Sequence, residues 1–145
     1  MTSSLTVARE FLHQAQSRGE TLTPMQLLKL VYIAHGWSLA LYNRPLISDE
    51  VQAWQYGPVI PRLYAVVRHY KGNQVEEING SPQEELSSDE KDLVCQVYER
   101  YGSLSGPQLS RLTHAQNTPW DQVYYPGSFG TVISQDLIED HSKSL

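Results

Sequence analysis

His114 and Asp121 are the two side chains in this sequence whose types and spacing could support hydrolysis. A histidine acts as a general base when a neighbouring carboxylate orients its ring, and these two residues flank Pro119-Trp120. The same region fits a structural interpretation, in which His114 bonds the last carbonyl groups of its helix and Trp120 fills the core. We favour the structural interpretation, predict that the chain is not an enzyme, and keep hydrolysis as an alternative.

The histidines of the chain do not have the spacing of metal ligands: they are His13, His35, His69, His114 and His141. Two ligands on one helix face would be four residues apart, and a Cys-x-x-Cys site needs two cysteines. Cys95 is the single cysteine of the chain. We therefore predict no metal site, no cofactor and no internal disulfide.

The segment from Val51 to Tyr64 combines aromatic side chains with two prolines and a glycine. Gly57-Pro58 forces a turn that holds the aromatic rings in place, and alternation along a short strand directs Trp54 and Tyr56 to the same side. The rings could anchor this segment on the core or form a contact surface, because exposed Trp and Tyr side chains dominate binding energy. We select four candidate partner-binding residues: Trp54, Tyr56, Pro58 and Arg62.

Acidic side chains outnumber basic ones by 16 to 11, which gives a net charge of -5. Phosphate neutralisation needs clustered Lys and Arg, so we expect no direct nucleic-acid partner. A local group of acidic residues has two interpretations, a solvated loop or a secondary patch that attracts a basic protein partner. The members of this group are Glu76, Glu77, Glu84 and Glu85.

Apolar residues recur at helical spacing in several segments, and Gly, Pro and capping residues mark their ends. The helices expected from this pattern cover residues 4–18, 24–42, 61–70, 87–101, 106–112 and 134–138. Ser87 and Glu90 match a capping box at the start of one of them. The segment from Pro24 to Tyr42 is apolar on nearly every face, so we place it at the centre of the fold.

Two polar residues, Lys29 and His35, interrupt this central helix. A long Lys stem usually carries its ammonium group to the surface, and we interpret Lys29 in that way. The apolar run from Leu27 to Tyr42 is shorter than the roughly 20 residues that cross a bilayer, so we expect no membrane partner. The N-terminus lacks a secretory signal and the lone cysteine needs no oxidising compartment, which together predict a cytoplasmic location.

The β-strand signals are few. Residues Val51–Tyr56 are rich in aromatic and β-branched side chains, and Gln74–Ile78 is the strand mate that we expect, followed by a turn and loop at Asn79–Pro82. The predicted fold is mainly α: a compact bundle of about five to six helices around a central apolar helix, with a small two- or three-stranded β element. The length of 145 residues fits one domain over residues 1–145.

The order of several motifs resembles a known family. Leu22-Thr23-Pro24-Met25-Gln26-Leu27-Leu28 is followed by Gly36-Trp37, then by Ala53-Trp54-Gln55-Tyr56-Gly57-Pro58-Val59, and later by Thr113-His114 and Pro119-Trp120. This pattern is similar to the SocA-like Panacea domain, which is also found in phage-associated proteins called GepA. The resemblance covers roughly residues 5–140 and depends on the combination of motifs, since each one alone is weak.

The resemblance implies an antitoxin, a small protein that silences a cognate toxin, usually encoded by the adjacent gene, through direct protein–protein binding. It also implies an alternative, an adaptor that delivers a toxin or other client to an ATP-dependent protease. The hydrolase that would use His114 and Asp121 is a third hypothesis from a different class. Toxicity of the neighbouring gene product, toxin half-life and a His114→Ala variant distinguish the three.

Overall fold

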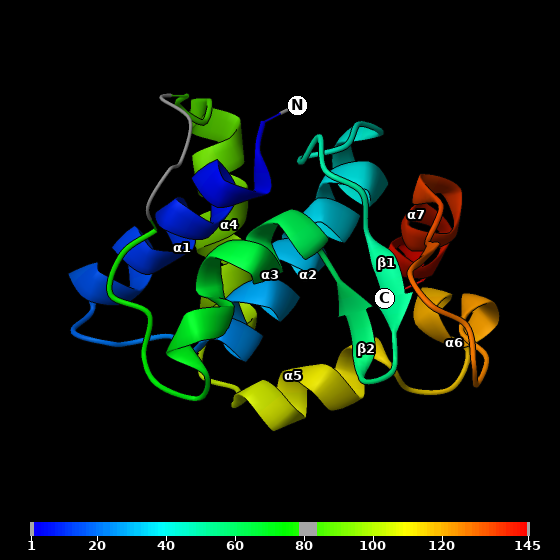
Figure 1. Cartoon of the computed structure of the whole chain (residues 1–145). Helices are drawn as coiled ribbons and strands as arrows, with labels where there is room; N and C mark the ends of the chain where they lie inside the picture. The colour runs from blue at the N-terminus through cyan, green and yellow to red at the C-terminus, as the bar shows by residue number, and fades with distance from the viewer. Residues whose placement is uncertain (1, 79–83, 145) are drawn as a thin grey trace.

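The computed structural model describes residues 2–78 and 84–144 and is mainly helical (Figure 1). The helices are α1 (Ser4–Ser17), α2 (Pro24–Tyr42), α3 (Pro61–Val67), the 3-10 helix η1 (Arg68–Tyr70), α4 (Ser88–Tyr101), α5 (Gly106–Thr113), α6 (Pro119–Val123) and α7 (Gln135–Lys143). The strands are β1 (Gln52–Trp54), β2 (Gly57–Val59) and β3 (Thr131–Val132). The predicted fold class is confirmed. The turn and loop predicted at Asn79–Pro82 lie outside the described residues.

Helix α2 lies at the centre of the bundle, as its apolar pattern predicted (Figure 1). Thr23 and Gln26 form a capping box at its start, and Asn43 ends it in the left-handed conformation with φ of 54°. Helices α1, α3, α4, α5 and α7 all pack against it. Within the described residues, no helix is both long and apolar enough to cross a membrane.

The close packing of α7 on α2 depends on Gly36. A Cβ atom at this position would lie 2.4 Å from Ser142 Oγ and 3.4 Å from Ile138 Cγ2 on α7, so a larger residue would require these side chains to move. Ile138 of α7 is buried in the same contact. The C-terminal helix is thereby seated directly on the central one.

The three strands form one antiparallel sheet in the order β2-β1-β3. β1 and β2 are a tight hairpin in which Trp54 is opposite Gly57, and β3 joins from the far end of the chain with Thr131 opposite Ala53. Ala53 is fully buried beneath the sheet. Both edges of β1 are therefore occupied by β2 and β3.

The prediction that Gln74–Ile78 is the strand mate of β1 is wrong. This segment has no regular secondary structure: Val75 N donates to the Leu22 carbonyl oxygen at 2.7 Å, beside the end of α1. Val75 and Ile78 are buried in the helical core. Their β-branched side chains fill that core. Buried β-branched residues are also typical of strands, so the local sequence did not distinguish the two cases.

Candidate functional site

A pocket of about 790 Å³ opens between the β1–β2 hairpin, helices α2, α3 and α5, and the segment from Tyr124 to Gly130. Its volume is in the range of binding sites for organic ligands or side chains of a partner. The lining residues are Pro24, Met25, Leu28, Lys29, Trp54, Gln55, Tyr56, Val59, Tyr64, Arg68, Lys71, Ser110, Tyr124, Gly127, Ser128, Phe129 and Gly130.

The hairpin is held rigidly at the mouth of this pocket. Gly57 has φ of +126°, a conformation that side chains disfavour, and it permits the sharp reversal between β1 and β2. The Trp54 ring packs edge-to-face on Tyr64 with centroids 5.1 Å apart, and its indole N–H donates to Gln52 at 2.9 Å. Ser110 Oγ of α5 donates to the Tyr56 carbonyl oxygen at 3.1 Å. The Trp54 ring and the backbone at Tyr56 are thus preorganised.

Trp120 connects the sheet to the segment that forms the other wall. Its indole N–H donates to the Trp54 carbonyl oxygen at 2.5 Å, and its ring stacks on Tyr124 with centroids 4.8 Å apart. Thr118 caps this short helix, α6, by accepting from Asp121 N at 3.3 Å. Trp120 is half-buried and serves the structure, as the structural interpretation of this region predicted.

Lys29 is buried, with 4% of its surface exposed, although it was predicted to reach the surface. Its ammonium group donates to the Pro58 carbonyl oxygen at 2.9 Å. Burial lowers the pKa of Lys29 from 10.5 to about 8, because a charged group loses its hydration there. Among the described residues, no carboxylate forms an ion pair with Lys29.

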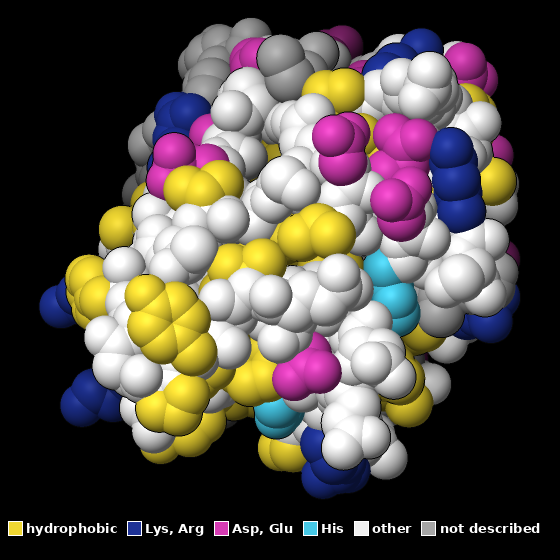
Figure 2. Space-filling model, turned by 90° about the vertical axis from the view of Figure 1, so that its right-hand side faces the viewer, with side chains coloured by type: hydrophobic (Ala, Val, Ile, Leu, Met, Phe, Trp, Pro, Cys, Tyr) yellow, Lys and Arg dark blue, Asp and Glu magenta, His cyan; other side chains and the backbone are white. Residues whose placement is uncertain are grey.

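The rim of the pocket carries aromatic side chains that face solvent. Tyr56 is 72% exposed and Phe129 is 94% exposed, and both line the pocket. Figure 2 shows the side of the molecule that bears α6 and α7, where hydrophobic side chains gather toward one edge and a group of acidic side chains lies apart from them. Exposed aromatic residues next to a pocket are typical of a surface that binds a partner.

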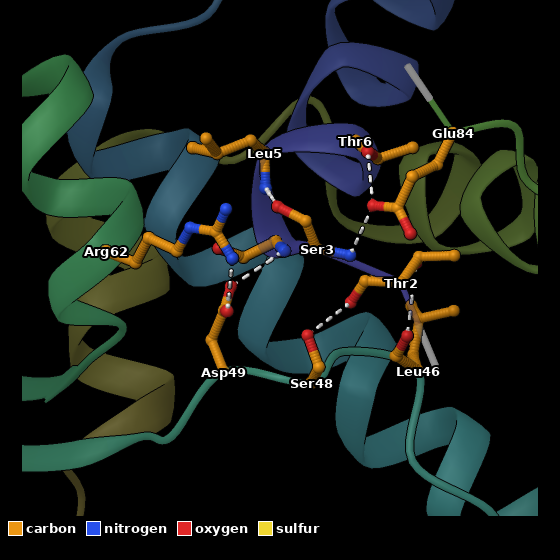
Figure 3. A network of polar contacts seen from close by, with 10 residues as sticks. Thr2, Ser3, Leu5, Thr6, Leu46, Ser48, Asp49, Arg62 and Glu84 are labelled. Carbon is orange, nitrogen blue, oxygen red and sulfur yellow. Dashed lines mark hydrogen bonds and ion pairs between the residues drawn. The ribbon is translucent and has the colours of Figure 1, made fainter. Parts of the chain in front are cut away.

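The four candidate partner-binding residues do not all belong to this pocket. Trp54 and Tyr56 line it, while Pro58 is buried and contributes its carbonyl group to Lys29. Arg62, on α3, belongs to a separate network around the start of α1, where it forms an ion pair with Asp49 at 3.2 Å (Figure 3).

That network also includes one of the acidic candidates (Figure 3). Glu84 accepts from Ser3 N at 3.0 Å and from Thr6 Oγ at 3.2 Å, so its carboxylate satisfies the first turn of α1. Asp49 accepts from Ser4 N at 2.8 Å in the same turn. The remaining acidic candidates, Glu76, Glu77 and Glu85, are exposed.

The pair considered for hydrolysis is not assembled. His114 Nδ1 bonds to the Ser110 carbonyl oxygen, and Asp121 accepts instead from Asn117 N at 2.9 Å. In the described part of the chain, no hydrogen bond or ion pair joins His114 to Asp121, and no cluster of His, Cys, Asp or Glu has the arrangement of a metal site.

Two residues that line the pocket, Lys29 and Phe129, were not among the predicted partner-binding residues. Lys29 lies on a helix that is apolar on nearly every face, so no side of the helix is expected to face solvent. This apolar surrounding indicates a buried cation. Phe129 lies between Gly127 and Gly130, in a short loop where a large ring has few neighbours. Tyr124 could not be predicted because its ring stacks on Trp120, which is itself bonded to the distant strand β1.

Comparison with known proteins places these features in a family. The profile described as "Antitoxin SocA-like, Panacea domain" matches residues 27–121, which include most of α2, the hairpin and Trp120. The chain is also 29% identical over 151 residues to Antitoxin SocA from Caulobacter vibrioides (strain NA1000 / CB15N), an alignment that covers 92% of this chain and 79% of that protein. No solved structure matched the chain. This protein belongs to the family of SocA-like antitoxins that carry the Panacea domain.

Proposed function

We propose that this protein neutralises a cognate toxin by binding it directly through the aromatic pocket and its rim. One observation carries the proposal: Tyr56 and Phe129 stand at the pocket with 72% and 94% of their surfaces exposed. Aromatic side chains in such positions supply most of the energy of protein–protein binding when a partner covers them. Membership of an antitoxin family supports the same role.

The fixed geometry of the hairpin also supports binding. The Trp54 ring is held by Tyr64 and Gln52, and Ser110 holds the backbone of Tyr56. Little conformational entropy of this ring and of the hairpin backbone therefore remains to be lost when a partner binds. In this proposal Arg62 and the exposed acidic residues lie outside the central contact and contribute to orientation and to the rate of association. The cognate toxin is the product of the adjacent gene, and the two proteins meet in the cytoplasm.

Co-expression with the neighbouring gene product tests the proposal. The wild-type protein should restore growth and copurify with the toxin, and Tyr56→Ala combined with Phe129→Ala should weaken the complex by about ten-fold or more. Leu41→Ala is the matched control, because Leu41 is a 61% exposed apolar residue of α2 that does not line the pocket. An undiminished complex with the double variant would refute the proposed contact.

The half-life of the toxin distinguishes neutralisation from delivery to a protease. Direct neutralisation leaves the toxin stable while its toxicity is lost. Delivery to an ATP-dependent protease shortens the toxin's half-life, and removal of the protease restores it. A short half-life that depends on this protein would therefore favour the adaptor.

A further inference from the structure

The charges around the pocket differ from those of the whole chain. Three basic side chains, Lys29, Arg68 and Lys71, are among the lining residues, and no Asp or Glu is. The chain as a whole has 16 acidic and 11 basic residues. All the charged side chains that line this pocket are basic, although the protein as a whole is acidic. The pocket therefore favours a ligand group with a negative charge.

The three cations occupy different environments. Arg68 and Lys71 are exposed, so water screens their fields. Lys29 is 4% exposed. Its surroundings are less polar than water, so its charge attracts a nearby anion more strongly than an exposed charge would. With its pKa at about 8, Lys29 still carries a proton at neutral pH.

The hydrogen-bonding capacity of Lys29 is only partly used. An ammonium group has three N–H donors, and in the described residues Lys29 Nζ has one acceptor, the Pro58 carbonyl oxygen. Gly57 keeps the space beside it clear, since a Cβ atom at that position would lie 2.9 Å from Lys29 Nζ. A buried cation with unused donors is costly for the folded protein and gains most from an anionic ligand.

The remaining walls of the pocket define what accompanies this negative charge. They consist largely of aromatic and aliphatic side chains, with Trp54, Tyr64 and Leu28 inside and the exposed rings of Tyr56 and Phe129 at the rim. Such walls favour an apolar or aromatic side chain over a hydrated ion such as phosphate. The exposed rim extends the apolar surface beyond the pocket, which favours a polypeptide segment over a small free ligand.

We infer that this pocket binds a segment of the toxin in which a carboxylate adjoins an aromatic or large aliphatic side chain, with the carboxylate paired to Lys29. The inference deepens the proposed function and rests on it. The apolar side chain packs between Trp54 and Phe129, and the carboxylate supplies the negative charge that Lys29 lacks within its own chain. Arg68 and Lys71 attract the segment toward the pocket.

A pair of small probes tests the carboxylate preference without the toxin. N-acetyl-L-tryptophan and its neutral amide share one side chain and differ in the carboxylate. Nuclear magnetic resonance titration should show the indole N–H signal of Trp54 shifting with the acid, and about ten-fold weaker binding of the amide. The preference should disappear in Lys29→Met, which removes the charge and shortens the side chain by one atom, and persist in Lys91→Met, a change at an exposed residue of α4.

Equal binding of the acid and the amide, binding of neither, or a preference that survives Lys29→Met would each overturn the inference. Thermal unfolding of Lys29→Met verifies that the variant is folded. Removal of the buried charge stabilises the variant, while loss of the hydrogen bond to the Pro58 carbonyl oxygen destabilises it, so we expect a melting temperature close to that of the wild type.

The toxin complex provides the second measurement. Lys29→Met should raise its Kd about ten-fold, whereas Lys91→Met should leave the Kd unchanged. If Tyr56→Ala with Phe129→Ala weakens the complex but Lys29→Met does not, the proposed function stands and the carboxylate inference fails. If the toxin complex does not form at all, the proposed function fails, and the inference that a toxin segment occupies the pocket fails with it.

Discussion

The pocket and the polar network at the start of α1 use charged residues in opposite ways. In the network, Asp49 and Glu84 accept hydrogen bonds from Ser4 and Ser3, and Arg62 pairs with Asp49 (Figure 3). In the pocket, Lys29 has a carbonyl group and no carboxylate among the described residues. Charges matched within the chain hold the start of α1 in place, while the unmatched buried charge of Lys29 lies where we propose that a partner binds.

The largest expected effect concerns His35, which fixes the loop that supplies Asp49. Its Nδ1 accepts from Leu46 N and Ile47 N at 3.2 and 3.4 Å, and burial lowers its pKa from 6.5 to about 4. The unfolded chain then binds the proton first, so stability falls as the pH drops from 6.5 to about 4, by about 3 kcal/mol.

Urea unfolding of wild type and His35→Gln across this range measures that loss. Carboxylates that titrate in the same range affect both proteins, so the difference between the two curves isolates His35. If the free energies of unfolding of the two proteins had the same pH dependence, protonation of His35 would not be the cause of the loss of stability.

The next effect concerns Gly57, which shapes the hairpin over Lys29. Gly57→Ala should destabilise the protein by about 2–3 kcal/mol, because a side chain is strained at this φ and also crowds the Lys29 ammonium. Gly19→Ala is the matched control, since Gly19 has φ of +69° but no neighbouring atom within 4 Å of the added Cβ. Its cost should be about 1 kcal/mol. Equal costs in chemical denaturation would mean that the contact with Lys29 contributes nothing.

Lys29 itself should make the protein more stable at alkaline pH. Its folded-state pKa is about 8 and its ordinary value is 10.5, so between these values the unfolded state holds the proton more tightly. Stability should rise by about 2 kcal/mol between about pH 7.5 and about pH 9.5, and Lys29→Met should lack this rise. Tyr32, whose pKa is raised by burial, reduces stability only at higher pH. Denaturant midpoints in this window provide the test, and a flat wild-type curve would contradict the buried cation.

The smallest effect concerns the carboxylate at the start of α1. Glu84→Ala removes the acceptor for Ser3 N and Thr6 Oγ and should cost about 1 kcal/mol. Glu85→Ala is the neighbouring control and should change stability by less than about 0.5 kcal/mol. Both glutamates are exposed, but in the described part of the chain the Glu85 carboxylate accepts no hydrogen bond. If thermal unfolding showed the same small change for both variants, the hydrogen bonds of Glu84 would contribute no measurable stability.

The helices could be predicted from the sequence because their signals are local. Thr23 with Gln26 and Ser87 with Glu90 cap α2 and α4, and the observed bounds of α2 are those predicted. The sheet was harder to predict, because β1 pairs with β3 across most of the chain and the segment at Val75 imitates a strand. Short strands carry too few residues to identify their mates by pattern alone.

The pocket residues that lie within one short segment could be predicted from the sequence. Those that are brought to the pocket by contacts between distant segments could not. Trp54 and Tyr56 could be selected from the aromatic, glycine and proline pattern around them. The partner of Glu84 is the distant helix start at Ser3, and the position of Phe129 depends on the strand that follows it. The burial of Lys29 differs from the prediction, because a helix surrounded on nearly every face leaves no path by which the lysine side chain could reach the surface.

The segment from Tyr125 to Gly130 is a surface loop whose two ends are both anchored on β1. Before it, Trp120 is bonded to β1, and after it β3 pairs with the same strand, while Tyr125 and Phe129 remain largely exposed. Insertions or replacements in such a surface loop leave the helical body undisturbed and change only what the pocket presents. A protein built in this way can acquire a new binding preference by altering one short stretch, so its recognition can evolve independently of its folding.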